Sequence, residues 1–524
     1  MNSIRVASLA ILASLMLVPP SFGAEGNKQQ PPILTPKQSP KPRINGVKVF
    51  GVRPGRPILY TIAATGERPM KFSAAGLPDG ARLDGEKGRI SGAIAKRGTY
   101  RVMLRAENAL GHAERELRLV VGDDICLTPL LGCNTYGGWG ARVTEANVRA
   151  AAEAMVRLGL INHGWQYVNI DDGWQGKRGG KHNAIQPNEK FGDLRAYCDY
   201  VHSLGLKAGI YSTPWATSYE GFCGGSSHDP QGAWVRPARP KDGYYFGKHF
   251  FEASDARQWA EWGFDYAKYD WNLASPGSVE AARRLADALA AQDRDIVLEL
   301  SNSAPVPSAA ALVGSAQLTR TTGDLVDLWD RSQMDSALRK WAVGIREVML
   351  QHDAYAPFQR PGHWNHACNL RVGLLGGWRN KPLTPSRLTP DEQYSHISLW
   401  CLWSSPMIIG TPIERLDEFT LSLLTNDEVL DVNQDPLGKQ AVRTELANGG
   451  EILVKELEDG TKAVGIFNPG SEPVKLTVQW SQMGMHGKQE VRDLWRQKDL
   501  GVFEKEFSTV VQRHGVVMVR LTAK

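Results

Sequence analysis

Hydrophobic and polar residues alternate in short runs along the first quarter of the chain. Between residues 44 and 122 the runs "ILYTIAA", "RISGAIA" and "TYRVMLRAEN" show no helical period, and Gly or Pro separates them. Period-two alternation broken by turn residues is typical of a β-sandwich. We predict an immunoglobulin-like β-sandwich over 43–122, preceded by a Pro- and Gln-rich linker over 24–42.

The pattern changes from Leu127 onward. Strand-like runs such as "YVNIDDGW", "LKAGIYST" and "IVLELSN" alternate with segments such as "EANVRAAAEAMVRLGL", in which apolar residues recur every three or four positions. Eight such units predict a (β/α)8 TIM barrel over 123–440. Strand-like runs then return ("VKLTVQW", "GVVMVRL"), which predicts a C-terminal antiparallel β-sandwich over 441–524. The predicted fold class is therefore multidomain, with a central barrel.

The first residues are typical of a signal peptide. Arg5 precedes an apolar segment over 6–18, and small residues follow at Ser21, Gly23 and Ala24. We predict a signal peptide over 1–23 and a secreted or periplasmic protein, with a membrane anchor as the alternative. No other stretch approaches the run of about 18 apolar residues that a membrane span requires.

Composition narrows the function classes. A net charge of +5 over 524 residues, without a Lys/Arg run interleaved with aromatics, gives no support to nucleic-acid binding. No Gly-rich phosphate loop or H-E-x-x-H helix is present, so we expect no cofactor and no metal. The six cysteines lack C-x-x-C spacing, and one or two disulfides are expected in an oxidising compartment.

Polar residues gather where the predicted barrel strands end, which is where barrel enzymes keep their chemistry. They are Asn134, Tyr136, Asp171, Asp172, Tyr211, Lys268, Asp270, Ser301, Arg320, Asp324, Trp364 and Asn365. An isolated K-x-D pair would be read as a solvated ion pair. The repetition of polar strand ends favours a site for a neutral sugar instead.

Hydrolysis of a glycoside needs two carboxyl groups across the anomeric carbon. Asp270 and Asp324 come from different strand ends and can face each other, and we expect about 5 to 6 Å between their carboxyl groups. Lys268 shares a strand face with Asp270, so it would hold that carboxylate ionised. Asp324 would need a raised pKa to act as an acid.

At these positions the sequence resembles glycoside hydrolase family 27, which includes α-galactosidases and α-N-acetylgalactosaminidases. The resemblance runs from about Leu127 to the C-terminus and is carried by "NIDDGW", "GIYS", "KYD", "RTTGD", "GHWN" and "DEQYSHISLW". The preceding sandwich resembles the immunoglobulin-like module of bacterial members.

The resemblance implies a role for each matched residue. Asp270 takes the position of the nucleophile and Asp324 that of the acid/base in a retaining mechanism. Other positions match sugar-binding residues: Asp171 and Asp172 for the hydroxyls on carbons 4 and 6, Lys268 and Arg320 as basic contacts, and Tyr136 and Tyr211 as aromatic walls.

Two stretches bear on the identity of the sugar. In "WNHACN", which begins with Trp364, His366 and Cys368 replace acids that are usual in relatives, and Cys368 stands where the replaced acid lines the site. A metal role for that pair is disfavoured because two residues are too few. In "LELSNSAP", Ser301 and Ala304 match relatives that accept N-acetylgalactosamine, which predicts room at carbon 2.

The sequence thus predicts a retaining exo-glycosidase that acts on terminal α-galactosides in a glycan. The alternatives are an α-N-acetylgalactosaminidase, an enzyme for another modified galactose, and a carbohydrate-binding pseudoenzyme. Retention of Asp270, Asp324, Lys268 and Arg320 argues against the last of these.

Overall fold

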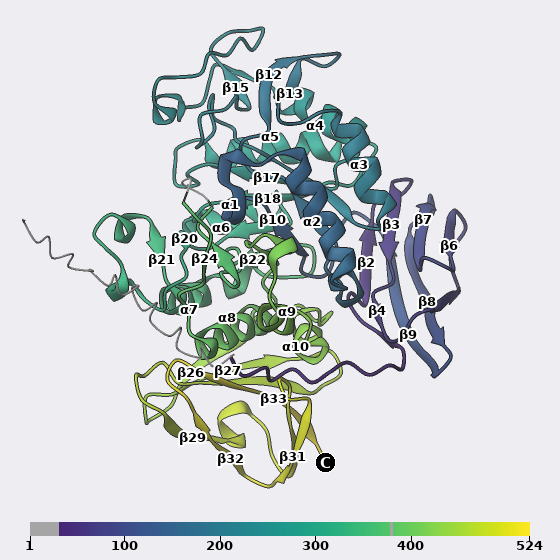
Figure 1. Ribbon diagram of the computed structural model, residues 1–524, viewed down its shortest axis with the longest axis vertical. Coiled ribbons are helices and arrows are strands. Elements are labelled where there is room, and N and C mark those ends of the chain that lie inside the picture. Colours follow the sequence, from purple (N-terminus) through teal and green to yellow (C-terminus); the bar gives the residue numbers. More distant parts are fainter. Residues whose placement is uncertain (1–30, 378–380) are drawn as a thin grey trace, which may run out of the picture. The chain divides into compact units, whose positions relative to one another are not determined.

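The computed structural model describes residues 31–377 and 381–524 (Figure 1). Residues 33–524 form one compact unit. The predicted signal peptide and the first residues of the predicted linker lie outside the described residues. Within the described chain, no helix is both long enough and apolar enough to cross a membrane.

Eight parallel strands of the described chain form the barrel, and each of the first six pairs with the next along the sequence. They are β10 (Leu131–Asn134), β11 (Tyr167–Asn169), β14 (Lys207–Ser212), β17 (Tyr266–Asp270), β18 (Val297–Ser301), β19 (Leu318–Arg320), β22 (Trp364–His366) and β25 (Met407–Ile409). β10 also pairs with β25, and Leu370, just after β22, bridges to Ile409. The ring therefore closes, and the predicted TIM barrel is confirmed.

Helices follow the strands and cover the barrel (Figure 1). The main ones are α2 (Glu145–Arg157), α3 (Leu194–Ser203), α4 (Glu252–Trp262), α5 (Ser278–Ala290), α6 (Val306–Leu312), α7 (Ile345–Gln351) and α8 (Pro390–Leu402). Thr144 is the N-cap of α2, and its side chain accepts a hydrogen bond from the backbone N–H of Asn147. Thr389 caps α8 in the same way and accepts from the backbone N–H of Glu392. The apolar face of α2, including Val148, Ala152 and Met155, is buried.

Two sheets pack on one core ahead of the barrel. One contains β2 (Val49–Val52), β9 (Gly111–Val121), β8 (Gly98–Asn108) and β5 (Lys71–Ala75), and the other contains β3 (Pro57–Thr61), β7 (Arg89–Ala93) and β6 (Ala81–Asp84). Ile58, Tyr60, Val102, Leu104 and Leu117 belong to the buried cluster between them. Its immunoglobulin-like character stays a prediction.

The C-terminal region is an antiparallel β-sandwich. A six-stranded sheet runs in the order β26 (Val442–Glu445), β27 (Glu451–Glu456), β28 (Lys462–Phe467), β33 (Val516–Ala523), β30 (Gln489–Asp493) and β31 (Lys498–Phe503). A pair, β29 (Val474–Gln479) and β32 (Glu506–Val511), shares its core through residues such as Leu476 and Phe507.

The cysteines differ from expectation. All six lie in the described residues and all are free, so the expected disulfides are not present. The thiols pack against other groups instead: Cys133 lies 4.0 Å from the sulfur of Met155, and Cys401 lies 3.7 Å from that of Met407. They behave as buried apolar side chains.

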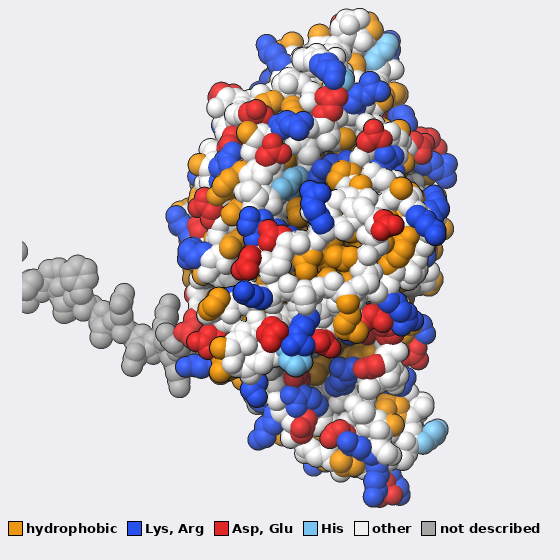
Figure 2. Space-filling model, turned by 90° about the vertical axis from the view of Figure 1, so that its right-hand side faces the viewer, with side chains coloured by type: hydrophobic (Ala, Val, Ile, Leu, Met, Phe, Trp, Pro, Cys, Tyr) orange, Lys and Arg blue, Asp and Glu red, His pale blue; other side chains and the backbone are white. Residues whose placement is uncertain are grey.

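Surface charge agrees with the small net charge. On the face shown in Figure 2, Lys and Arg side chains are interspersed with Asp and Glu. Many of them form exposed ion pairs, such as Arg97 with Asp123. Such mixing favours solubility over strong attraction of a polyanion.

Candidate active site

Lys268 and Asp270 sit at the carboxyl end of β17 with their side chains on the same face. The Lys268 ammonium lies 3.5 Å from Asp270 Oδ2 and 2.9 Å from Asp171 Oδ2, and it lies over the ring of Tyr211 on the neighbouring strand β14. Because parallel strands end at one edge, residues from β10, β11, β14 and β17 meet here. One cation thus joins two carboxylates.

A second donor holds Asp270. Asn302, just after β18, donates from Nδ2 to Asp270 Oδ1 at 2.5 Å, and also to the Tyr219 hydroxyl at 3.2 Å. Asn302 has φ of 72°, a left-handed conformation that Asn tolerates better than most residues. One oxygen of the Asp270 carboxylate therefore accepts a hydrogen bond from Asn302, and the other forms an ion pair with Lys268.

The pKa of Asp270 reflects two opposing effects. Burial raises the pKa above its ordinary value, and Lys268 opposes this effect without cancelling it. The side chain is only 11% exposed, so desolvation of the charged form outweighs the nearby ammonium. Lys268 favours the ionised form of this carboxyl group, and the expectation that Asp270 is ionised at neutral pH stays a prediction.

Asp324 lies at the start of β20 (Asp324–Leu325) and reaches the mouth of the barrel, where its side chain is 48% exposed. Arg320 Nη2 donates to its Oδ1 at 3.1 Å. Desolvation raises the pKa of Asp324, but the Arg320 guanidinium outweighs it, so the pKa lies below its ordinary value. The raised pKa that a general acid needs is therefore not present in the free protein, because Arg320 is paired with this carboxyl group.

Asp171 and Asp172 follow β11. Asp171 accepts hydrogen bonds from Lys268 and, at 2.6 Å, from the amide of Asn134. Asp172 accepts from the Glu220 backbone N–H at 2.9 Å, and burial raises its pKa to about 7. These two carboxylates form an acceptor-rich wall beside Asp270.

Tyr136 joins this wall through a residue that the sequence reading did not single out. Its hydroxyl donates to Glu220 Oε1 at 2.5 Å. Glu220 belongs to the loop after β14, which also carries Trp215 and Tyr219. Tyr244 stacks on Trp215 with ring centroids 4.8 Å apart, and Tyr219 meets both rings edge-on. The aromatic density of "TPWATSYEGF" was the available signal for this second wall.

Some predicted residues lie away from the site. Trp364 begins β22 and pairs with Leu318, the first residue of β19, so it lies at the opposite end of the barrel. Its side chain is fully buried, and Nε1 donates to the carbonyl of Cys126. Trp364 therefore does not line the site, contrary to the prediction.

Ser301, the last residue of β18, and Ala304, which follows that strand, are both buried, and the predicted room at carbon 2 stays a prediction. Ser301 is buried and accepts a hydrogen bond from Arg320 at 3.5 Å. Ala304 is fully buried, and its backbone N–H donates to the Arg320 carbonyl at 3.0 Å. Both positions support Arg320, whereas Asn302 between them reaches Asp270.

The residues that replace usual acids are also buried. His366 lies in the barrel interior, with Nδ1 2.7 Å from Glu299 Oε1. Cys368 is 1% exposed and has φ of 97°, and its carbonyl accepts a hydrogen bond from Trp400. Neither side chain is open to the mouth of the barrel.

Known proteins are similar along most of this chain. The family described as "Alpha galactosidase A" matches residues 139–233 and 240–435, and the "Alpha galactosidase C-terminal beta sandwich domain" matches 447–521. Alpha-galactosidase 2 of Arabidopsis thaliana is 30% identical over 78% of this chain and 92% of its own length. Alpha-galactosidase A of Cellvibrio japonicus is 30% identical over 77% of this chain and 94% of its own length.

Solved structures agree. A protein from Bacteroides fragilis has a TM-score of 0.82 and 30% identity, covering 93% of this chain and 98% of that chain. α-Galactosidase I of Mortierella vinacea has a TM-score of 0.65 and 26% identity, covering 76% of this chain and 98% of that chain. The fold and these matches define a barrel glycoside hydrolase. The chain belongs to the α-galactosidase family, glycoside hydrolase family 27.

Proposed function

We propose that this protein is a retaining exo-glycosidase that removes terminal α-linked galactose from a glycan. The observation that carries the proposal is the buried Asp270 carboxylate, held by Lys268 and Asn302 at the carboxyl end of the barrel. These contacts fix the orientation of the carboxylate. The protein also belongs to a family whose named relatives are α-galactosidases. A carboxylate of this kind suits nucleophilic attack on an anomeric carbon.

In the proposed reaction, Asp270 attacks carbon 1 of the sugar while Asp324 gives a proton to the departing oxygen. A covalent galactosyl ester forms and the aglycone leaves as an alcohol. Asp324, now ionised, takes a proton from water, and the resulting hydroxide attacks carbon 1 and releases Asp270. Since Arg320 lowers the pKa of Asp324 in the free protein, the bound sugar must raise that pKa by excluding water from the half-exposed carboxyl.

Recognition of galactose rests on the acceptor wall. Asp171 and Asp172 accept hydrogen bonds from sugar hydroxyls, and the Lys268 ammonium donates to one. Because Lys268 already joins Asp171 to Asp270, it also links sugar recognition to the nucleophile. The buried positions of Ser301 and Ala304 favour plain galactose over its 2-acetamido counterpart.

The test is hydrolysis of a panel of nitrophenyl glycosides. We expect turnover of 4-nitrophenyl α-galactoside and its loss, by at least about 1,000-fold, in Asp270→Asn, because an amide cannot form the ester. The panel includes the 2-acetamido analogue and the β-L-arabinopyranoside, since a structural neighbour of 26% identity is named a β-L-arabinopyranosidase. Binding of galactose without turnover of any substrate would favour a lectin-like pseudoenzyme.

Export to the periplasm or the medium is also proposed, on the strength of the N-terminal sequence alone. Determination of the first residues of the protein recovered from the producing cells tests this. A mature chain that begins near residue 24 supports export, and a chain that retains residues 1–23 contradicts it.

A further inference from the structure

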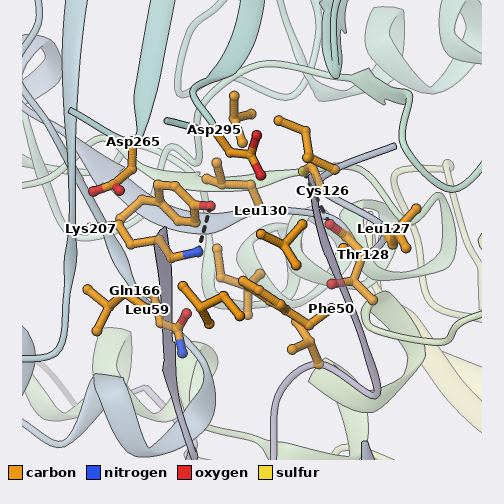
Figure 3. Close-up of a pocket in the computed structure, with 18 of the residues that line it drawn as sticks. Phe50, Leu59, Cys126, Leu127, Thr128, Leu130, Gln166, Lys207, Asp265 and Asp295 are labelled. Carbon is orange, nitrogen blue, oxygen red and sulfur yellow. Dashed lines mark hydrogen bonds between the residues drawn. The ribbon is translucent and has the colours of Figure 1, made fainter. Parts of the chain in front are cut away.

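A cavity of about 290 Å³ lies at the amino ends of the barrel strands, remote from Asp270 at the carboxyl ends. The strands that border it contribute their first residues: Tyr167 opens β11 and Lys207 opens β14. The preceding sandwich supplies the facing wall through Phe50 and Leu59 (Figure 3). The cavity is thus bounded by two parts of the fold.

The carboxylates that line this cavity are already paired. Asp265 lies 2.6 Å from Arg294 Nη2 and 2.7 Å from His202 Nε2. Asp295 accepts hydrogen bonds from the backbone N–H and the Nε of Arg53, at 2.8 and 2.5 Å. Neither carboxylate forms an ion pair with Lys207.

Lys207, unlike the carboxylates that line the cavity, has no partner of opposite charge within ion-pair distance among the described residues. Its ammonium lies 3.4 Å from the Tyr167 hydroxyl, 4.9 Å from the centre of the Phe50 ring and 5.2 Å from that of the Tyr167 ring. No carboxylate of the described residues forms an ion pair with it. Lys207 is partly buried, and burial lowers the pKa of its ammonium, an effect that the more distant Asp265 and Asp295 carboxylates only partly offset. An anion in the cavity would relieve that cost.

The remaining lining is mostly apolar. Leu59, Leu127 and Leu130 are among the apolar side chains that line the space (Figure 3). Apolar walls with one charged anchor recognise a ligand that has an apolar body and one charged end. The volume is close to the lower limit for small-molecule pockets, so the body must be small.

We propose that this cavity binds a small monocarboxylate, with its carboxylate on the Lys207 ammonium and its apolar body against Phe50, Leu59 and Leu130. A sugar fits the lining less well, because its many hydroxyls would face mostly apolar walls, with Thr128, Gln166 and Gln434 among the uncharged polar side chains of the lining. A ligand here contacts the sandwich and the barrel together, so its binding stabilises the folded protein as a whole.

Benzoate is the probe, and benzyl alcohol is its neutral counterpart of similar shape. We expect about 10 mM benzoate to raise the thermal midpoint of the full chain by about 2 °C, and benzyl alcohol to leave it unchanged. Lys207→Met keeps the length of the side chain without its charge, and we expect it to abolish the benzoate shift. Lys71→Met, at an exposed position on β5, is the matched control and keeps the shift.

A second variant keeps the proposal testable if Lys207→Met fails to fold. Leu59→Trp retains the ammonium and fills the cavity, so it too should lose the benzoate shift. Hydrolysis of 4-nitrophenyl α-galactoside by the Leu59→Trp protein should match wild type, since the cavity is distant from Asp270. Equal shifts with benzyl alcohol, equal shifts in the variants, or no shift with benzoate would each overturn the proposal.

Discussion

Asp270 is oriented by donors that come from different strands. Lys268 lies two residues earlier on β17, whereas Asn302 follows β18 and lies 32 residues further along the chain. Asn302→Gly removes the amide but keeps the left-handed backbone without strain. A hydrogen bond to a charged group contributes about 1.5–3 kcal/mol, so we expect kcat/KM to fall about 10- to 100-fold.

The pH profile separates this role from a merely structural one. Loss of a donor raises the pKa of Asp270 further, and attack requires the ionised form. The acid limb of kcat/KM should therefore move to higher pH in Asn302→Gly. An unchanged acid limb together with wild-type activity would show that Asn302 does not support the nucleophile. Ser303→Gly, at the exposed neighbouring position, provides the control.

Asp324 is expected to matter most when the leaving group is poor. An activated aryl oxide departs with little protonation, whereas an alkoxide needs a proton. Asp324→Ala should reduce hydrolysis of methyl α-galactoside by about 100-fold or more and that of the 4-nitrophenyl substrate much less. Steady-state kinetics on the two substrates measures the ratio, and equal losses would count against Asp324 as the acid.

At the scale of one element, β14 depends on a glycine. A Cβ atom at Gly209 would lie 2.0 Å from Asn169 Oδ1 and 2.7 Å from Tyr266 Cδ1, on the two strands that flank β14. Gly209→Ala should therefore lower stability by about 1–3 kcal/mol or more through overpacking. Gly314→Ala, where a Cβ meets nothing within 4 Å, should leave the midpoint of thermal unfolding nearly unchanged.

Sequence periodicity predicted the elements well and their ends less well. Eight alternating units were readable because strand and helix periods differ. The sequence did not show at which end of the barrel Trp364 lies, because β22 has only three residues. The pairing of Arg320 with His366 in the structure shows that Trp364 begins this strand and His366 ends it. The contact between Asn302 and Tyr219, 83 residues apart, comes from two loops and follows no local pattern.

The sequence predicted where the charged residues of the site lie but not which residues they pair with. Arg320 and Asp324 stand in the same motif, yet only the structure shows the guanidinium 3.1 Å from the carboxyl group that it keeps ionised. Alternation predicted that Lys268 shares a face with Asp270, but its shorter contact is with Asp171, from another strand. Directions of pKa shifts depend on such long-range contacts and on burial.

At the scale of the whole molecule, buried ion pairs tie the barrel to the C-terminal sandwich. Arg346 of α7 donates to both oxygens of Glu451 in β27, at 2.6 and 2.8 Å, and Glu451 is 3% exposed. Arg346→Met leaves Glu451 with Arg443 alone, at 3.3 Å, so we expect a loss of about 1–3 kcal/mol.

Calorimetry of the full chain measures this loss. The exposed pair of Arg97 and Asp123 supplies the comparison, since Arg97→Met should leave the midpoint of thermal unfolding nearly unchanged. Equal effects of the two substitutions would show that the Arg346 pair does not hold the C-terminal sandwich in place.

The identity of the nucleophile is the central claim, and the configuration of a rescued product tests it most directly. In Asp270→Gly, azide can occupy the place of the missing carboxylate and attack carbon 1 of 4-nitrophenyl α-galactoside from the opposite face to the leaving group. We predict that azide restores release of nitrophenol and that the product is β-galactosyl azide. Failure of rescue, or formation of α-galactosyl azide by this variant, would contradict the assignment of Asp270 as the nucleophile.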